Sequence, residues 1–136
     1  MGTFIHKNRV AFSDTDMAGI VHFSNFFRYA EIAESALFRS IDEPLIDLEH
    51  AKGWPRVSAS FDYLEPLCFD DAFETHLTIL RLGMSSISWQ VEIRIDGVLL
   101  ASGSMTTIYC AASDEGFTKV AIPAALKLKL ESFVST

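Results

Sequence analysis

One long amphipathic helical pattern constrains the fold of this chain more than any other feature of its sequence. The pattern covers residues 24–41, with Ser24 as the candidate N-cap and Pro44 closing the helix. Apolar residues recur at spacings of three and four, as on one face of a helix that would be about 27 Å long. The apolar stripe contains Phe26, Tyr29, Ala30, Ala33, Ala36, Leu37 and Ile41, and the opposite side carries Arg28, Glu31, Glu34, Ser35 and Arg39.

Most of the remaining chain has the pattern of β-strands. Apolar and polar residues alternate most clearly over residues 87–95, and Asp96-Gly97 directly afterwards is typical of a type I′ hairpin turn. The sequence therefore predicts an α+β protein in which one long helix packs on an antiparallel sheet. The predicted strands are residues 3–12, 57–63, 73–82, 87–95 and 98–110.

Two shorter helices and a lack of internal boundaries complete the predicted organisation. Residues 45–52 are expected to form a short helix that ends at Gly53 and Pro55, and residues 123–133 a terminal helix. No repeat, linker or low-complexity segment divides the sequence, so residues 1–136 are expected to form a single domain. One helix cannot cover both faces of a sheet, and we therefore expect the chain to form a homo-oligomer.

Charge and targeting signals limit the expected partners and location. The net charge is −7 and the basic residues are scattered singly, which argues against nucleic acid or an anionic membrane as a partner. The sequence begins without a signal-peptide pattern and has no apolar run of membrane-spanning length, so we expect a cytoplasmic protein. Cys68 and Cys110 lie far apart in apolar segments, which favours a buried, reduced pair over a disulfide.

The residues just before the long helix carry the strongest chemical signal. Asp14 and Asp16 stand in a polar segment after the first predicted strand, and Gly19 supplies the backbone freedom for a tight turn. A carboxylate is thereby placed beside a helix N-terminus, where free N–H groups and the helix dipole attract negative charge. This arrangement suits a reaction at a carbonyl group, in which the carboxylate attacks or activates water and the N–H groups hold the oxyanion.

Each of these polar residues also has a structural interpretation. Asp16 is either catalytic or a turn carboxylate that caps nearby amides, whereas we interpret Asp14 as structural. His22 is either bonded to the backbone or acts as a proton donor or substrate contact. The aromatic residues early in the helix belong mostly to the core, and one or two of them could line an acyl pocket.

Several other kinds of site are not supported by the sequence. Ser102-Gly103-Ser104 lacks the Gly-x-Ser-x-Gly pattern of serine hydrolases and interrupts a predicted strand. There is no glycine-rich phosphate loop or dinucleotide fingerprint, and the four histidines lack the spacing of metal ligands. The sequence therefore predicts neither a metal nor an organic cofactor.

The segment that begins at Asp14 resembles the hydroxybenzoyl-CoA thioesterase family of hotdog-fold proteins. It reads Asp-Thr-Asp-x-x-Gly-Ile-Val-x-Phe-x-Asn-x-x-Arg-Tyr. The resemblance implies a hotdog fold, in which a five-stranded antiparallel sheet wraps around the long helix. It also implies dimers formed through the sheet, often assembled into a homotetramer, with sites at the dimer interface. Further family positions, which extend the resemblance over nearly the whole chain, are matched by Gly53-x-Pro55-x-Val57-Ser58 and Asp70-Asp71.

The resemblance also implies roles for individual residues. The catalytic carboxylate of the family corresponds to Asp16, and the amide of Phe23 at the helix start would polarise the thioester carbonyl. His22, Asn25 and Gly19 are assigned to oxyanion stabilisation or substrate positioning. The candidate residues of the substrate pocket are Ile20, Phe26 and Ser58.

The expected function is hydrolysis of an acyl-CoA thioester to a carboxylic acid and CoA, with Asp16 as nucleophile or general base. Residues 81–86 contain one cation where some aryl-CoA members have a basic cluster, so the carrier is open between CoA and an acyl-carrier protein. The acyl group and the choice between dimer and tetramer are open as well. Two alternatives come from other classes: a hydratase or dehydratase that uses His22 with Asp16, and a non-catalytic acyl-thioester binding protein.

Overall fold

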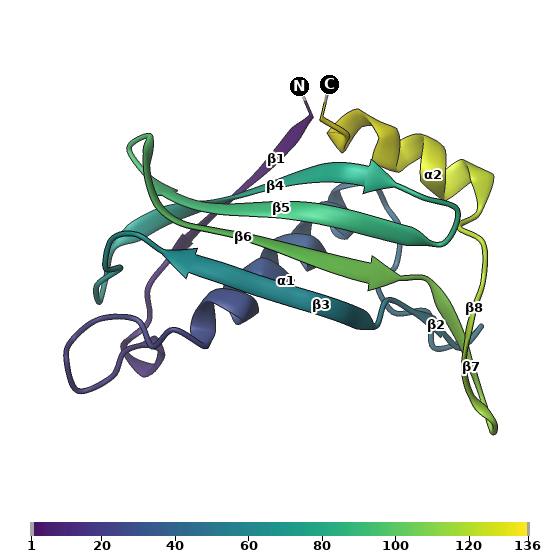
Figure 1. Cartoon of the computed structure of the whole chain (residues 1–136), viewed down its shortest axis with the longest axis horizontal. Coiled ribbons are helices and arrows are strands. Elements are labelled where there is room, and N and C mark those ends of the chain that lie inside the picture. The colour runs from purple at the N-terminus through teal and green to yellow at the C-terminus, as the bar shows by residue number, and fades with distance from the viewer. Residues whose placement is uncertain (1, 136) are drawn as a thin grey trace.

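A curved antiparallel sheet and one long helix make up most of the molecule (Figure 1). This computed structural model describes residues 2–135, so Met1 and Thr136, the two ends of the expected domain, lie outside the described residues. The five strands of the sheet, in spatial order and with antiparallel neighbours, are β1 (Thr3–Arg9), β4 (Ala72–Leu82), β5 (Ser86–Ile95), β6 (Val98–Ile108) and β3 (Arg56–Tyr63).

The central strands follow the predicted alternation. The turn between β5 and β6 is the predicted hairpin, because Asp96 and Gly97 both have positive φ. Alternate side chains of β5 enter the core and the intervening polar ones do not, as expected for a sheet that buries one face. The predicted α+β class is therefore confirmed. The buried side chains of β5 are Ile87, Trp89, Val91 and Ile93.

Helix α1 (Asn25–Ser40) packs on the inner face of this sheet and supplies much of the core (Figure 1). Ser24 occupies the predicted N-cap position, but its side chain makes no capping hydrogen bond. The buried residues of the helix are Phe26, Tyr29, Ala30, Ala33, Glu34, Leu37 and Phe38.

The prediction that Glu34 lies on the polar side of this helix is wrong, since Glu34 is only 1% exposed. The chain before β3 covers that side: the Trp54 ring packs on Phe38 with centroids 5.8 Å apart. Arg56, the first residue of β3, donates to Glu34 Oε1 at 2.5 Å. The pairing with an arginine explains how a carboxylate is accommodated on the buried face.

The prediction of a helix over residues 45–52 is wrong. Asp47 and Lys52 exchange two backbone hydrogen bonds of 2.9 Å, and Ala51 adopts positive φ. The Asp47 side chain also accepts the His50 N–H at 3.1 Å, so a local turn replaces helical hydrogen bonding. The sequence also did not predict the three-stranded sheet that starts here, formed by β2 (Lys52–Gly53), β7 (Cys110–Ser113) and β8 (Gly116–Lys119).

Both ends of the chain largely follow the predictions. The expected terminal helix consists of α2 (Ala124–Leu130) and a 3-10 turn, η2 (Glu131–Phe133). The first strand is shorter than predicted, because β1 ends at Arg9 and a 3-10 turn, η1 (Phe12–Asp14), follows. No helix within residues 2–135 is both long enough and apolar enough to cross a membrane.

The two cysteines differ in their surroundings. Both are free thiols, and Cys110 is buried as expected. Cys68 is exposed, so the expectation of a buried pair is wrong for this residue. It lies in a surface turn, where its N–H donates to Asp71 Oδ2 at 2.9 Å.

Candidate active site

The loop between β1 and α1 turns at Gly19 and presents Asp16. Gly19 has a φ of +80°, which glycine adopts readily, and its N–H donates to the Asp16 carbonyl at 3.0 Å. The Asp16 N–H donates to the Ile20 carbonyl, also at 3.0 Å. Asp16 is exposed, and its Oδ1 accepts the Ala18 N–H at 2.9 Å. No group within residues 2–135 donates to Oδ2, so half of this carboxylate is free for chemistry.

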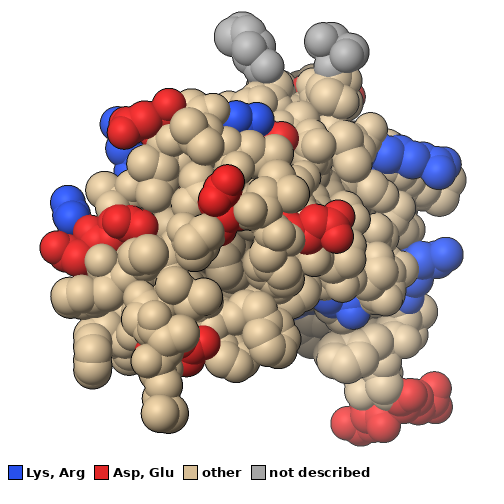
Figure 2. All heavy atoms as spheres, turned by 60° about the vertical axis from the view of Figure 1, so that its left-hand side comes forward, with Lys and Arg blue, Asp and Glu red and all other residues tan. Residues whose placement is uncertain are grey.

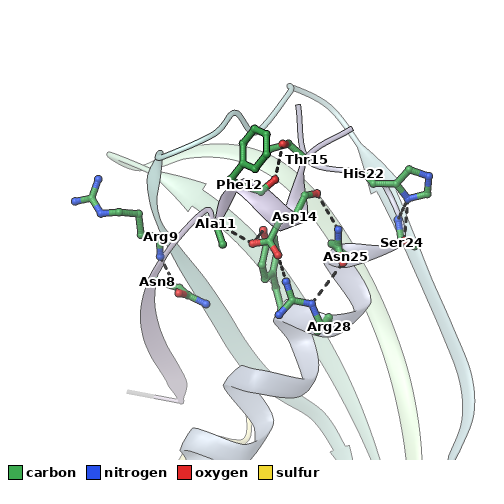
Figure 3. A network of polar contacts seen from close by, with 11 residues as sticks. Asn8, Arg9, Ala11, Phe12, Asp14, Thr15, His22, Ser24, Asn25 and Arg28 are labelled. Atoms are coloured by element: carbon green, nitrogen blue, oxygen red, sulfur yellow. Dashed lines mark hydrogen bonds and ion pairs between the residues drawn. The ribbon is translucent and has the colours of Figure 1, made fainter. Parts of the chain in front are cut away.

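Asp14, in contrast, is the buried centre of a polar network (Figure 3). It is 4% exposed, and its Oδ2 accepts the Tyr29 hydroxyl at 2.7 Å and the Ala11 N–H at 3.0 Å. Arg28 forms an ion pair with Oδ1. Burial, together with the hydrogen bond to Asp14, raises the pKa of Tyr29 well above its usual range, so its hydroxyl remains a donor. These contacts agree with the structural interpretation of Asp14.

The Asp14 carbonyl group connects the loop to the beginning of α1. It accepts the His22 N–H at 3.0 Å and the Asn25 side-chain amide at 2.8 Å. Arg28 Nε donates to Asn25 Oδ1 at 3.4 Å, which occupies the other end of that amide (Figure 3). The side chain of Asn25 is thus used within the protein to hold the helix start.

His22 is exposed and forms hydrogen bonds with Ser24, two residues along the chain, but none with Asp16. Its Nδ1 accepts the Ser24 backbone N–H at 3.3 Å and lies 2.8 Å from Ser24 Oγ. A backbone N–H can only donate, so the neutral ring carries its proton on Nε2. The ring stacks on Phe23 with centroids 4.5 Å apart.

The N–H group of Phe23 is left without an acceptor among residues 2–135, whereas the backbone groups around it are paired. The His22 carbonyl accepts the Asn25 N–H at 2.9 Å, and the Phe23 carbonyl accepts the Phe26 N–H at 3.3 Å. Phe23 is 62% exposed, so its N–H is not sealed in the core. An unpaired donor at the positive end of a helix dipole can hold a developing oxyanion.

Asp16 and Phe23 line one cleft with a volume of about 430 Å³. Ile20 and Phe26, two of the three predicted pocket residues, line it as well. The third, Ser58, lies farther along β3 and is exposed outside this cleft. The other candidates, Gly19, His22 and Asn25, shape the loop and the helix start but do not line it.

The residues of the opposite wall of the cleft were not predicted from the sequence. It comes from the end of β3 and the segment after it, which the folded sheet brings against the helix start. The available signal was an aromatic residue, Tyr63, at the end of an alternating strand, followed shortly by Pro66. The missed lining residues are Val21, Tyr63, Leu64, Glu65, Pro66 and Leu67.

The cleft is mainly apolar, and none of the described residues that line it is a cation. Asp16 and Glu65 are the only charged side chains that line it within the described part of the chain. Partial burial raises the pKa of Tyr63, so its hydroxyl stays protonated in neutral and moderately alkaline solution. The face that Figure 2 brings forward shows acidic and basic groups interspersed with uncharged surface, and no continuous basic area. The cleft therefore favours an uncharged, apolar group.

Residues 18–102, more than half of the chain, match the family model of the thioesterase superfamily. The chain belongs to this superfamily. The resemblance to hotdog-fold thioesterases and the expected class of enzyme, a thioester hydrolase, are thereby confirmed. The matched range begins just after Asp16 and includes the helix start, α1 and most of the sheet.

Individual relatives resemble the chain over most of its length. A solved structure of a protein from Aquifex aeolicus has 30% identity and a TM-score of 0.84, covering 93% of this chain and 98% of that chain. The structure of a 1,4-dihydroxy-2-naphthoyl-CoA thioesterase from Synechocystis has 26% identity and a TM-score of 0.84, covering 95% and 96%. A 1,4-dihydroxy-2-naphthoyl-CoA hydrolase from Synechococcus sp. is 29% identical over 133 residues, or 91% of this chain and 86% of the relative.

Proposed function

We propose that this protein hydrolyses an acyl-CoA thioester at the cleft between the start of α1 and the end of β3. One observation supports this proposal above all. Asp16, with one free carboxylate oxygen, and Phe23, with an unpaired N–H, line the same cleft. A thioesterase needs both elements: a group that attacks or activates water, and a donor for the oxyanion.

Asp16 acts in one of two ways. As a nucleophile, its free oxygen attacks the thioester carbon, the tetrahedral intermediate expels CoA thiolate, and water then hydrolyses the mixed anhydride. As a general base, it removes a proton from the water that attacks the same carbon. In both routes the Phe23 N–H stabilises the negative oxygen, and the thiolate leaves readily without a strong general acid.

The acyl group is proposed to be uncharged and hydrophobic, with an aromatic acyl group as the first choice. The rings of Phe23, Phe26 and Tyr63 line the cleft, and its lining among residues 2–135 includes no cation to pair with a second carboxylate on the substrate. The relatives from Synechocystis and Synechococcus carry names of aryl-CoA hydrolases. CoA is the proposed carrier, and an acyl-carrier protein is the alternative.

The test is release of free thiol, followed with a thiol-reactive dye, from a panel of acyl-CoA esters. The panel includes benzoyl-, hydroxybenzoyl-, naphthoyl- and straight-chain acyl-CoA. Asp16→Asn should lower turnover at least about 100-fold, because it removes the negative oxygen and keeps the shape of the side chain. Asp114→Asn, in the exposed β7–β8 hairpin, is the matched control and should leave turnover unchanged.

Two results would contradict the proposal. If wild type releases no thiol from any member of the panel, the protein is not a CoA thioesterase. If Asp16→Asn retains turnover, the chemistry is done by another group. Bound but uncleaved acyl-CoA would favour a binding protein. A hydratase or dehydratase has less support, since His22 is bonded to Ser24 and lies outside the lining of the cleft.

A further inference from the structure

Tyr63, the last residue of β3, reaches across the cleft to the helix start. Its hydroxyl donates to the Phe23 carbonyl oxygen at 3.0 Å. Its ring packs edge-on against Phe26 with centroids 5.0 Å apart, and against Phe23 with centroids 6.5 Å apart. One side chain of the sheet is thus bonded to the residue whose N–H is unpaired.

The two peptide groups that flank Phe23 are held in different ways. The peptide that carries the Phe23 N–H is fixed through its carbonyl, which accepts the Asn25 N–H at 2.9 Å. The following peptide is bonded at both ends: its N–H, from Ser24, donates to His22 Nδ1 at 3.3 Å, and its carbonyl, from Phe23, accepts the Phe26 N–H at 3.3 Å. The 3.0 Å bond from Tyr63 is the shorter of the two that this carbonyl accepts. Tyr63 therefore limits rotation of the backbone on the carboxyl side of Phe23.

Because Tyr63 belongs to the sheet, its hydrogen bond to the Phe23 carbonyl links the helix start to a well-supported strand. Residues Arg56 to Tyr63 pair with β6 along nearly the whole of β3, so the strand is a firm support. The loop before α1 carries Asp16 and the Phe23 N–H, while β3 carries the opposite wall of the cleft. The hydrogen bond from Tyr63 on β3 to Phe23 at the end of this loop sets the distance from the oxyanion donor to the opposite wall of the cleft.

We propose that Tyr63 is a positioning residue for the oxyanion donor, acting through the Phe23 carbonyl, in the hydrolysis proposed above on which this role rests. Its hydroxyl is not needed to satisfy a deeply buried group, because Tyr63 is 43% exposed and water can reach this side chain. The ring alone would fill the space between Phe23 and Phe26. What the hydroxyl adds is a fixed orientation of the backbone at Phe23, which matters most in the transition state.

The experiment compares wild type with Tyr63→Phe, which removes the hydroxyl and leaves the ring contacts. On the best substrate of the thiol-release panel, kcat should fall about 10-fold and KM should change less than about 2-fold, since the donor acts on the transition state. The melting temperature should stay within a few degrees of wild type. Tyr109→Phe is the matched control, because Tyr109 lies outside the cleft in a separate pocket and no described residue bonds its hydroxyl, and it should keep the wild-type kcat.

The outcomes separate this role from the proposed function. Wild-type turnover that is lost in Asp16→Asn but unchanged in Tyr63→Phe would overturn the role of Tyr63 and leave the thioesterase proposal standing. A fall in kcat that is matched by unfolding, or a rise in KM alone, would also overturn it, because the hydroxyl would then support stability or substrate binding. Absence of turnover in wild type would overturn both proposals. A lower kcat with wild-type stability and KM supports the positioning role.

Discussion

Two carboxylates separated by one residue face different surroundings in the loop before α1. Asp14 is buried and bonded by Tyr29, Ala11 and Arg28, whereas Asp16 is exposed with a free oxygen. The division of work follows from these contacts. A carboxylate that accepts three partners holds the loop to the helix, and one that keeps a free oxygen in a cleft is available for reaction.

This division predicts opposite effects of two similar substitutions. Asp14→Asn should lower the free energy of unfolding by about 2 kcal/mol, because the amide has one acceptor oxygen and cannot serve both the Tyr29 hydroxyl and the Ala11 N–H inside the protein. Asp16→Asn should change the stability little while abolishing turnover. Urea denaturation measures both. Asp70→Asn is the control, since the Arg9–Asp70 pair is well exposed and contributes within about 0.5 kcal/mol. Equal stability of Asp14→Asn and Asp70→Asn would refute the structural role.

Glu34 predicts a pH dependence of stability. Burial raises its pKa above the ordinary value of 4.5, and the Arg56 guanidinium lowers it only in part. The folded protein therefore binds this proton more tightly than the unfolded chain, and stability falls as the pH rises from about 4.5 through the raised pKa. Glu34→Gln removes this loss, so the stability of the variant relative to wild type should increase over that interval and then level off.

The measurement is urea denaturation at a series of pH values from about 4 to 8. Glu115→Gln, at an exposed site in the β7–β8 hairpin, serves as the control, and its stability relative to wild type should not vary with pH. A flat difference for Glu34→Gln as well would mean that Glu34 has the same proton affinity in the folded and unfolded states.

At the scale of elements, the pairing of β3 with β6 depends on Gly103. A Cβ atom at this position would collide with the Ser60 carbonyl and lie 2.7 Å from Cδ1 of the Phe61 ring. Gly103→Ala should therefore destabilise the protein by about 2 kcal/mol and lower turnover, because β3 carries Tyr63 and one wall of the cleft. Gly53→Ala is the matched control, since nothing lies within 4 Å of its added Cβ. Thermal unfolding and thiol release check both, and similar behaviour of the two variants would contradict the prediction.

The elements that the sequence predicted well are those with a regular hydrophobic period. The pattern of β5, the Asp96-Gly97 turn and the long helix depend on residues close in sequence, and all three are present. The helix prediction for residues 45–52 failed because the Asp47 side chain competes with helical hydrogen bonds, which the hydrophobic period does not reveal. The burial of Glu34 was not predicted for another reason: its partner, Arg56, comes from a distant strand.

The candidate site shows the same limit. Asp16, Ile20, Phe23 and Phe26 belong to one local segment, and the structure places them together in the cleft. The opposite wall, with Tyr63, is brought there by the pairing of β3 with β6, which no local pattern specifies. Local chemistry could thus be predicted from the sequence, whereas the contacts across the cleft required the folded sheet.

At the scale of the whole molecule, β3 is an edge strand of the five-stranded sheet and carries exposed apolar surface. Val57 is 59% exposed, and Ser58, which the resemblance assigns to the substrate pocket, is exposed on the same strand and outside the cleft of its own chain. An unpaired edge of this kind is suited to pair with another copy. We therefore predict a dimer or tetramer in which a second copy adds its β3 residues to the cleft.

Val57→Asp tests this assembly, because a carboxylate introduced beside a symmetric contact is repelled by its own copy. Analytical ultracentrifugation should show wild type as a dimer or tetramer and Val57→Asp as a smaller species with at least about 10-fold lower turnover. Leu128→Asp is the control: this residue is 69% exposed on α2, away from β3, and its replacement should change neither mass nor turnover. A wild type that sediments as a fully active monomer would show that one copy completes the site alone.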